Sequence, residues 1–411
     1  MPNDKIVQTT IIGKVYNENK GKTYRLNNLL EEYFKLIILY ISIGLELKDM
    51  SKSSLHEFTY SKTCDEFNLV TGLIQTAMDK SVEILKSFKK SDKGKTEKKR
   101  KNRRLKMKRI SIRFDKRIFK FEKKENKLTP YWLTLSTDGI RWHRISLPIQ
   151  LGKDQIEKVE NGWRPVSVEM VKKNGQWFAH ITIEKWIKFK EPKTVIGIDI
   201  GEVNFASCMA IKIDNQDKYI KGQIWRGEEI KRIRGLYGHI RRSLGRKKLP
   251  NKIKEIGRKE NRKVNQEVHI IANEIIEYAK QFEDPIIAME DLTNIRYSFN
   301  MSKKLNKRFH SLPFYKLKKY VEYKANSQGI NVQFIEPFDT TKTCHRCRNV
   351  SHVYGREYRC SKCGMVYNRD LNASINIAHF LMRDMGWLRS EPSRPMNENI
   401  DVKSNLNVGN S

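Results

Sequence analysis

Four cysteines toward the carboxyl end of the chain stand at the spacing of a metal-binding module. They form two C-x2-C pairs separated by 12 residues, Cys344 with Cys347 and Cys360 with Cys363. Such spacing is typical of a zinc ribbon, in which four thiolates hold one Zn²⁺ in a tetrahedron. Because four protein ligands complete the coordination sphere, we expect this zinc ion to be structural. His345 and His352 are surplus to the set, and we expect them on the surface or facing nucleic acid.

Three acidic residues lie where a carboxylate is costly unless it is paired or binds a metal. Asp199 sits in the apolar strand VIGIDIG, Glu290 ends the apolar strand IIAMED, and Asp370 opens a helix after the cysteines. Three carboxylates at one sheet edge could hold two Mg²⁺ ions, the arrangement that hydrolyses phosphodiesters. Taken singly, each also fits a turn or helix-cap acid. G-I-D-I-G by itself also fits ATP-binding actin-like and sugar-kinase domains.

The net charge points to a polyanionic partner. The 411 residues carry 81 Lys and Arg against 47 Asp and Glu, a formal charge of +34, and nucleic acid is the expected partner. In residues 86–109, 14 of 24 positions are Lys or Arg. A charge block alone is usually a solvated run, but here we expect contacts with phosphates. The candidates in this strip are Lys98, Lys99, Arg100, Lys101, Arg103 and Arg104.

The elements that position these residues follow from the apolar pattern. Residues 5–16 alternate like a strand, and helical spacing runs from Leu26 to about residue 88. Residues 110–187 read as antiparallel strands with turns at STDG and KKNG, forming a small barrel or curved sheet. Strands and helices then interleave after Pro192, which indicates a layered α/β domain. The tryptophans of the β region could stack bases, although such residues more often fill a barrel core.

No segment predicts a membrane protein. The longest apolar run, FKLIILYISIGL, contains Lys35 and is too short for a span of about 20 residues, so we expect a core helix. The N-terminus lacks a signal-peptide pattern, which favours the cytoplasm. Cys64 and Cys208 stand apart from the cysteine pairs in apolar surroundings, and we expect them to be ordinary core thiols.

Several motifs, in order, resemble the TnpB (OrfB) family of transposon-associated nucleases, to which the miniature type V CRISPR effectors are related. The motifs are GIDIGEVNFAS, AMEDLTNIR, YKANSQGINVQFIEP, TTKTCHRC, YRCSKCG and NRDLNASINIA. The resemblance is dense from about residue 194 to 380. It implies an α/β, RuvC-like RNase H fold with an inserted four-Cys zinc ribbon, preceded by an N-terminal β-barrel (wedge) domain with a helical recognition insertion.

The same resemblance implies a domain order. Residues 1–20 would be the first wedge strand, 21–108 the helical recognition domain with the basic strip, and 109–190 the wedge barrel. Residues 191–341 would begin the RuvC-like domain, 342–366 would be the zinc ribbon that binds target nucleic acid, and 367–382 the last RuvC-like helix. We expect residues 383–411 to be a disordered tail.

The resemblance also implies an activity, RNA-guided cleavage of double-stranded DNA beside a short flanking motif. Asp199, Glu290 and Asp370 would bind two Mg²⁺ ions, the four cysteines one Zn²⁺, and a guide RNA would be a partner. Basic helices would contact nucleic-acid backbones through Arg241, Arg242, Arg246, Lys247 and Lys248, although a solvated helix face is the alternative. Two positions depart from the pattern of many relatives. Glu202, close to the expected metal site, stands where many relatives have a basic or small apolar residue, and Asn368 stands where many have an acidic residue.

Other functions remain open at this stage. An RNA-guided repressor that does not cleave would not need the three acids, and a guide-free nuclease or transposition accessory would not need so large an N-terminal region. A miniature CRISPR effector would have the same sequence features. An ATPase is excluded, because the first glycine of a Walker A motif ending in GKT at 21–23 would fall at Tyr16. The oligomeric state, monomer or dimer, stays open.

Overall fold

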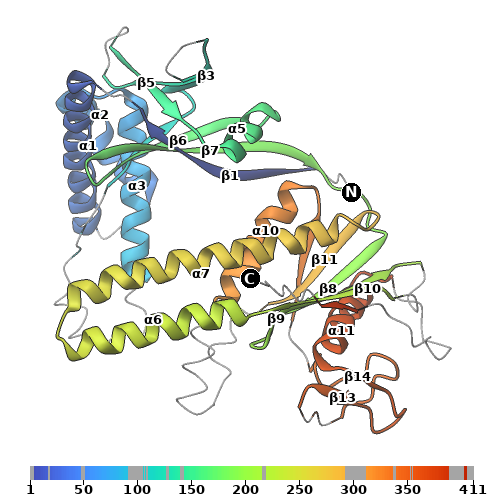
Figure 1. Ribbon diagram of the computed structural model, residues 1–411. Helices are drawn as coiled ribbons and strands as arrows, with labels where there is room; N and C mark the ends of the chain where they lie inside the picture. Colours follow the sequence, from blue (N-terminus) through green and yellow to red (C-terminus); the bar gives the residue numbers. More distant parts are fainter. Residues whose placement is uncertain are drawn as a thin grey trace. The chain divides into compact units, whose positions relative to one another are not determined.

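The computed structural model describes residues 4–16, 19–47, 51–90, 105, 107, 110–125, 129–138, 143–214, 219–291, 312–336, 339–351, 353, 355–387 and 402–404. It divides into two compact units, residues 6–186 and residues 1–5 with 187–411, here the N-terminal and the C-terminal unit (Figure 1). The six candidate residues of the basic strip, Lys98 to Arg104, lie outside the described residues, as does His352. Within the described part of the chain, no helix is long and apolar enough to cross a membrane.

Three helices follow the first strand of the N-terminal unit: α1 (Lys20–Glu46), α2 (Lys52–Glu66) and α3 (Thr71–Lys90). Asn19 caps α1, because its side chain accepts a hydrogen bond of 2.8 Å from the amide of Lys22. The buried positions of α1 recur at helical spacing, and its Tyr33 hydroxyl donates to Thr76 of α3. The predicted core helix over FKLIILYISIGL is therefore confirmed as part of α1.

Seven strands form the sheet of this unit in the order β2-β6-β7-β1-β5-β4-β3. Their bounds are β1 (Asp4–Val15), β2 (Ile112–Asp115), β3 (Phe119–Lys123), β4 (Tyr131–Ser136), β5 (Arg144–Gln150), β6 (Arg164–Lys173) and β7 (Gln176–Lys188), with helix α5 (Lys153–Glu160) between β5 and β6. The predicted β6–β7 hairpin is confirmed, and it turns at Asn174 and Gly175, which have φ of 51° and 81°. Trp163 and Trp177 are buried and fill the core. Closure of this sheet into a barrel stays a prediction.

The C-terminal unit is built on a mixed sheet in the order β12-β11-β8-β9-β10-β15. The strands are β8 (Thr194–Asp199), β9 (Asn204–Lys212), β10 (Tyr219–Arg226), β11 (Pro285–Glu290), β12 (Asn331–Ile335) and β15 (Val402–Ser404). β8, β11 and β12 run parallel, whereas β9 is antiparallel to β8 and β10. The expectation of an α/β layered domain is thus confirmed. β15 pairs with β10 inside the segment that we expected to be disordered.

Helices cover both faces of this sheet: α6 (Glu228–Arg246), α7 (Pro250–Ala279), α10 (Phe314–Ser327) and α11 (Arg369–Asp384). Alternate residues of β8 divide between two cores, as the period of a strand requires. Ile196 and Ile198 pack with the apolar residues of α7 and α10, whereas Val195 packs with those of α11. α11 therefore lies on one face of the sheet, and α7 and α10 lie on the other (Figure 1).

Gly197 allows α11 to lie directly on β8. A Cβ atom at this position would stand 1.9 Å from the carbonyl oxygen of Ser374 and 2.8 Å from the amide nitrogen of Ala378. The Ser374 hydroxyl also donates a 2.7 Å hydrogen bond to the carbonyl of Ser207 on β9. The glycine of the GIDIG motif thus brings the start of α11 close to the end of β8.

We expect Gly197→Ala to lower the free energy of unfolding by about 1–3 kcal/mol, because the added methyl group overpacks the contact with α11. The matched control is Gly238→Ala in α6, where a new Cβ meets nothing within 4 Å. That substitution should be neutral or should stabilise the helix by up to about 1 kcal/mol. Denaturant unfolding measures both. Equal midpoints for wild type and Gly197→Ala would contradict the close packing.

Candidate functional site

Asp199 and Glu290 end two neighbouring parallel strands at the same edge of the sheet. β8 pairs with β11 so that Ile198 stands opposite Met289, and the two acids are the next residue on each strand. By the alternation of a strand, both carboxylates fall on the face that α11 covers, together with Val195. The topology therefore brings these two predicted residues together.

Asp370 joins them from the first turn of α11. Its side chain is 7% exposed, and α11 is held on β8 at Gly197. The helix is capped by Asn368, whose side chain accepts hydrogen bonds from the amides of Asp370 (3.0 Å) and Leu371 (3.1 Å). Asp370 is thus not the cap. Asn368, identified from the sequence as a departure from the family pattern, has a local structural role as the helix cap.

The electrostatics indicate that the three carboxylates are close neighbours. Burial, together with the charges of Glu290 and Asp370, raises the pKa of Asp199 to about 8. Burial likewise raises the pKa of Glu290, against a hydrogen bond from Thr340 that lowers it. Like charges gathered in a partly buried site repel each other, which disfavours the ionised forms of the carboxyl groups. A bound divalent cation would instead favour the ionised forms.

Protein donors hold these carboxylates in the structure. Asn204, at the start of β9, donates a 2.6 Å hydrogen bond to Asp370, and Arg356 lies 3.3 Å from the same oxygen. Thr340 donates a 2.5 Å hydrogen bond to Glu290. Among the residues described, the four cysteines are the group of His, Cys, Asp or Glu side chains close enough to hold a metal ion as they stand. The three carboxylates would therefore draw closer together around a bound cation.

These partners were not predicted. Asn204 lies within the motif GIDIGEVNFAS that contains Asp199, and Thr340 lies within the motif TTKTCHRC that contains Cys344. Both motifs therefore also contained the polar residues that bind the carboxylates. Arg356 lies in the loop before the ribbon strand β13 (Glu357–Arg359), and nothing in its sequence surroundings distinguishes it from the other arginines.

The four cysteine thiols form a compact cluster that fits a metal ion. The Sγ atoms of Cys344 and Cys363 are 3.7 Å apart, those of Cys347 and Cys360 are 3.4 Å apart, and all four lie within 4.8 Å of one another. Tetrahedral zinc with Zn–S bonds of about 2.3 Å places sulfurs roughly 3.8 Å apart, whereas disulfide sulfurs lie about 2.05 Å apart. The cluster could therefore bind zinc, and its spacing is not that of disulfides.

The two C-x2-C loops fold in the same way. The residue after each pair has positive φ, 58° at Arg348 and 69° at Gly364. The amide of Arg348 donates to the carbonyl of Cys344 (2.8 Å), and that of Gly364 donates to the carbonyl of Cys360 (3.1 Å). Each loop thus turns back on itself and presents two thiols to a common centre, beside the short hairpin of β13 and β14 (Val366–Asn368).

Two asparagines of α11 hold this ribbon against the helix that carries Asp370. The Asn372 side-chain oxygen accepts from the backbone amide of His345 (3.1 Å) and lies 2.8 Å from its Nδ1, while its amide donates to Thr343 (2.8 Å). One helical turn later, Asn376 donates to the carbonyls of Thr340 (2.7 Å) and Thr343 (2.6 Å). All these contacts are buried or partly buried, so the ribbon and α11 form one packed assembly.

His345 does not lie on the surface. It is 6% exposed, its ring meets Tyr367 edge to face at 5.0 Å, and burial lowers its pKa to about 4. Because the Asn372 oxygen can only accept, the neutral ring carries its proton on Nδ1. Our expectation of a surface or nucleic-acid-facing histidine was wrong. The residue is a structural link between the ribbon and α11.

We expect Asn372→Ala to lower the free energy of unfolding by about 1–3 kcal/mol, because it leaves the buried His345 amide and ring without their acceptor. The exposed Asn251→Ala on α7 is the matched control and should change stability by less than about 0.5 kcal/mol. Thermal unfolding compares the two. A similar small effect for both substitutions would mean that the ribbon is held by other contacts.

On the opposite face of the sheet, a buried lysine anchors the end of β11. Lys318 of α10 is 5% exposed, its ammonium pairs with the Asp291 carboxylate, and it lies 3.9 Å from the centroid of the Phe334 ring. The Asp291 amide also donates to the carbonyl of Ile335 (2.8 Å). Since successive residues of an extended chain face opposite sides, this anchor leaves Glu290 facing the other acids.

The predicted basic helices are α6 and α7, which lie side by side (Figure 1). Arg241 is half-buried and pairs with Glu260 of α7, which is 2% exposed and also binds Arg234 at 2.9 Å. Arg241 therefore links the two helices. The other four candidates, Arg242, Arg246, Lys247 and Lys248, are exposed.

Comparisons with known proteins agree with this geometry. The family profile described as Cas12f1-like, TNB domain, matches residues 314–377, which include α10, the ribbon and the start of α11. A TnpB-like protein of Methanocaldococcus jannaschii is 30% identical over 253 residues, 59% of this chain and 87% of that protein. The CRISPR-associated endodeoxyribonuclease Cas12f1 of an uncultured archaeon is 24% identical over 288 residues, 64% of this chain and 53% of that protein.

Among solved structures, the fold is similar to that of Cas12f1 in a cryo-EM complex with sgRNA and target DNA. The TM-score is 0.62 at 17% sequence identity, and the match covers 87% of this chain and 82% of that one. At this identity the similarity concerns the fold, which is α/β and Cas12f-like.

Proposed function

The chain belongs to the family of TnpB-like proteins, and from this premise we propose that it is an RNA-guided DNA endonuclease that cuts at a single site. The observation that carries the proposal is the meeting of Asp199, Glu290 and Asp370 at one edge of the sheet. A relative named as an endodeoxyribonuclease, at 24% identity, supports a nuclease. Transposon association, as in the family that the sequence resembles, is part of the proposal.

We assign the mixed sheet of the C-terminal unit with α11 to a RuvC-like domain, into which the cysteine ribbon of residues 342–366 is inserted. Support comes from the order of the parts: two acids on adjacent strands, then the ribbon, then the third acid on the helix that packs over those strands. In the N-terminal unit, the seven-stranded sheet would be the wedge domain, and helices α1, α2 and α3 would be its recognition insertion.

Each residue of the candidate active site has a definite role in this proposal. Asp199, Glu290 and Asp370 would hold two Mg²⁺ ions, which when bound activate the attacking water and stabilise the leaving oxygen of a phosphodiester. Thr340 orients the Glu290 carboxylate, and Asn204 orients that of Asp370. Arg356 brings a positive charge of the ribbon to the same carboxylate, where a phosphate of the substrate would pass.

A structural Zn²⁺ is proposed for the four cysteines, because their sulfur separations match a tetrahedron of thiolates. Zinc would fix both C-x2-C loops and, through Asn372 and Asn376, the start of α11. The ribbon would thus support the position of Asp370 and could guide substrate strands toward it.

The proposed partners are a guide RNA and a double-stranded DNA target. If the guide reads the target by base pairing, the protein needs mainly to hold backbones and to recognise a short flanking motif, which a charge of +34 suits. The candidates for these backbone contacts are the exposed cations of the α6–α7 hairpin, Arg242, Arg246, Lys247 and Lys248. Arg241 could contact a backbone only while it also pairs with Glu260.

The test is to express the protein with its flanking genomic DNA, purify it and sequence the RNA that copurifies. A discrete RNA ending in sequence adjacent to the locus, and Mg²⁺-dependent cutting of DNA matched to it, is the expected result. Binding of that DNA without cutting would indicate a repressor. Random RNA fragments together with cutting that needs no guide would indicate a simpler nuclease and would refute RNA guidance.

A further inference from the structure

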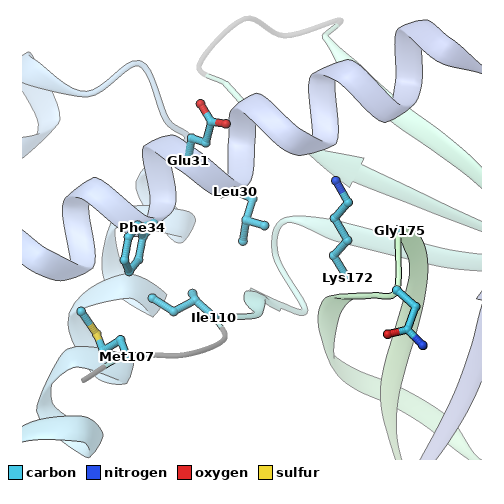
Figure 2. A pocket seen from close by; sticks show the side chains of 8 residues that line it. Leu30, Glu31, Phe34, Met107, Ile110, Lys172 and Gly175 are labelled. Atoms are coloured by element: carbon cyan, nitrogen blue, oxygen red, sulfur yellow. The ribbon is translucent and has the colours of Figure 1, made fainter. Parts of the chain in front are cut away.

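A pocket of about 490 Å³ lies in the N-terminal unit, between helix α1 and the β6–β7 hairpin. Figure 2 shows its side chains: Leu30, Phe34, Met107 and Ile110 gather on one side, and Lys172 extends toward α1 from the other. The volume is within the range of about 300–1,000 Å³ that is usual for small-ligand sites. The proposed mechanism does not use this pocket, because it lies in a different unit from the three carboxylates.

The apolar side of the pocket suits a flat aromatic ligand. Phe34 is half-buried and so retains an accessible part of its ring, and Met107 adds a polarisable thioether. Leu30 and Ile110 are also half-buried. A stacked base on an aromatic side chain is the usual way in which single-stranded nucleic acid is held without regard to sequence.

The polar groups at the pocket suit the edge of a nucleobase and its phosphate. Glu31 is exposed at the rim, and Figure 2 shows its carboxylate pointing away from Leu30 and Phe34. Asn174, in the hairpin turn, carries an amide that can both donate and accept. Lys172 gives one hydrogen bond to Asn27 of α1 (2.7 Å), and an ammonium has three donors, so the same group can also attract a phosphate.

We propose that this pocket binds one unpaired nucleobase of a single-stranded nucleic acid. Met107 lies near the end of the 86–109 strip, in which 14 of 24 residues are Lys or Arg, and Ile110 directly follows it in the sequence. A polyanion attracted to that strip is therefore brought close to the pocket. The inference rests on the proposed function in one respect, since a guided nuclease holds both RNA and unwound DNA. Either strand is a possible source of the base.

Binding of short oligonucleotides tests the proposal without requiring cleavage. The probes are single strands of about 12 nucleotides, within the usual range of site sizes: oligo(rA), oligo(rU), oligo(dA), oligo(dT) and an abasic strand of equal length. We expect wild type to bind base-bearing strands more tightly than the abasic strand. Phe34→Ala should weaken binding of base-bearing strands by roughly 5- to 150-fold, as expected for loss of one stacked base, and should leave the abasic strand unaffected.

Glu31→Lys separates base recognition from charge. If the surface only attracted phosphates, replacing an acid by a cation would strengthen the binding of every strand. A pocket that also stacks a base predicts the same gain for base-bearing and abasic strands, because Glu31 points away from Phe34 (Figure 2). Glu31→Lys should therefore keep the ratio of base-bearing to abasic affinity at the wild-type value, whereas Phe34→Ala should lower it. Phe58→Ala and Glu57→Lys on α2 are the matched controls, because both residues are exposed and neither lines the pocket.

The outcomes decide the proposal and the source of the base. Loss confined to RNA strands would support the proposal with the guide as ligand, and loss confined to DNA strands would support it with an unwound target strand. An unchanged ratio of base-bearing to abasic affinity in Phe34→Ala, or an equal fall of that ratio in Glu31→Lys and Phe34→Ala, would overturn it. Failure of guided cleavage would leave these binding results intact, so the two proposals can fail separately.

Discussion

Replacing Asp199 by asparagine is expected to lower Mg²⁺-dependent DNA cleavage at least about a thousandfold and to leave RNA binding unchanged. The carboxylate ends β8 at the edge where Glu290 and Asp370 also lie, and a neutral amide is a poor substitute for a charged oxygen ligand of a hard cation. A thousandfold loss corresponds to about 4 kcal/mol of transition-state stabilisation, within what a catalytic metal supplies. Single-turnover cleavage and RNA binding measure the two effects.

The same substitution should stabilise the protein in the absence of Mg²⁺. Burial and two neighbouring acids raise the pKa of Asp199 to about 8, so its ionised form is disfavoured in the folded state at neutral pH. Folding at neutral pH therefore requires Asp199 to take up a proton that the unfolded carboxylate lacks. An asparagine avoids this cost, so the substitution should raise the free energy of unfolding by about 0.5–2 kcal/mol, as is common where stability is sacrificed for activity. Asp214→Asn, an exposed acid after β9, is the matched control and should change neither property. Unimpaired cleavage by Asp199→Asn would refute the assignment of the site.

Features encoded by local spacing could be predicted from the sequence. The C-x2-C pairs sit in short loops, so their spacing alone implies that the thiols converge, and the apolar strands before Asp199 and Glu290 imply two parallel strand ends at one edge. The role of Gly197 was also available, since a glycine inside an apolar strand signals the close approach of another backbone. The family and the α/β class were predicted correctly for these reasons.

Features that depend on side-chain contacts between distant segments could not be predicted. His345 stands between Cys344 and Arg346 in the sequence, and only the contact with Asn372, 27 positions later, explains its burial. Arg356 reaches Asp370 through the fold of the ribbon, with no pattern in the sequence to indicate it. β15 consists of three residues in a polar tail and is paired through its backbone, which carries no sequence information.

Replacing two ribbon cysteines, Cys360 and Cys363, by serine is expected to remove bound zinc and to abolish DNA cleavage while RNA binding is largely kept. Structural zinc contributes about 10–16 kcal/mol to small domains that fold around it, far more than the few apolar residues of this ribbon can replace. Zinc content by mass spectrometry, cleavage rate and RNA affinity are the measurements. Cys64→Ser, which changes a thiol of α2 outside the cluster, controls for the chemistry of the substitution.

The reason to expect loss of cleavage before loss of RNA binding lies in the contacts of α11. Asn372 and Asn376 join the ribbon to the helix whose first turn carries Asp370, so a disordered ribbon leaves buried amides without partners beside that carboxylate. Among the described residues, no hydrogen bond or ion pair joins the exposed cations of the α6–α7 hairpin to the ribbon, so RNA held there should remain bound. If zinc removal weakened RNA binding and cleavage to the same extent, the ribbon would serve only the stability of the fold. Loss of cleavage alone would make it part of the catalytic site.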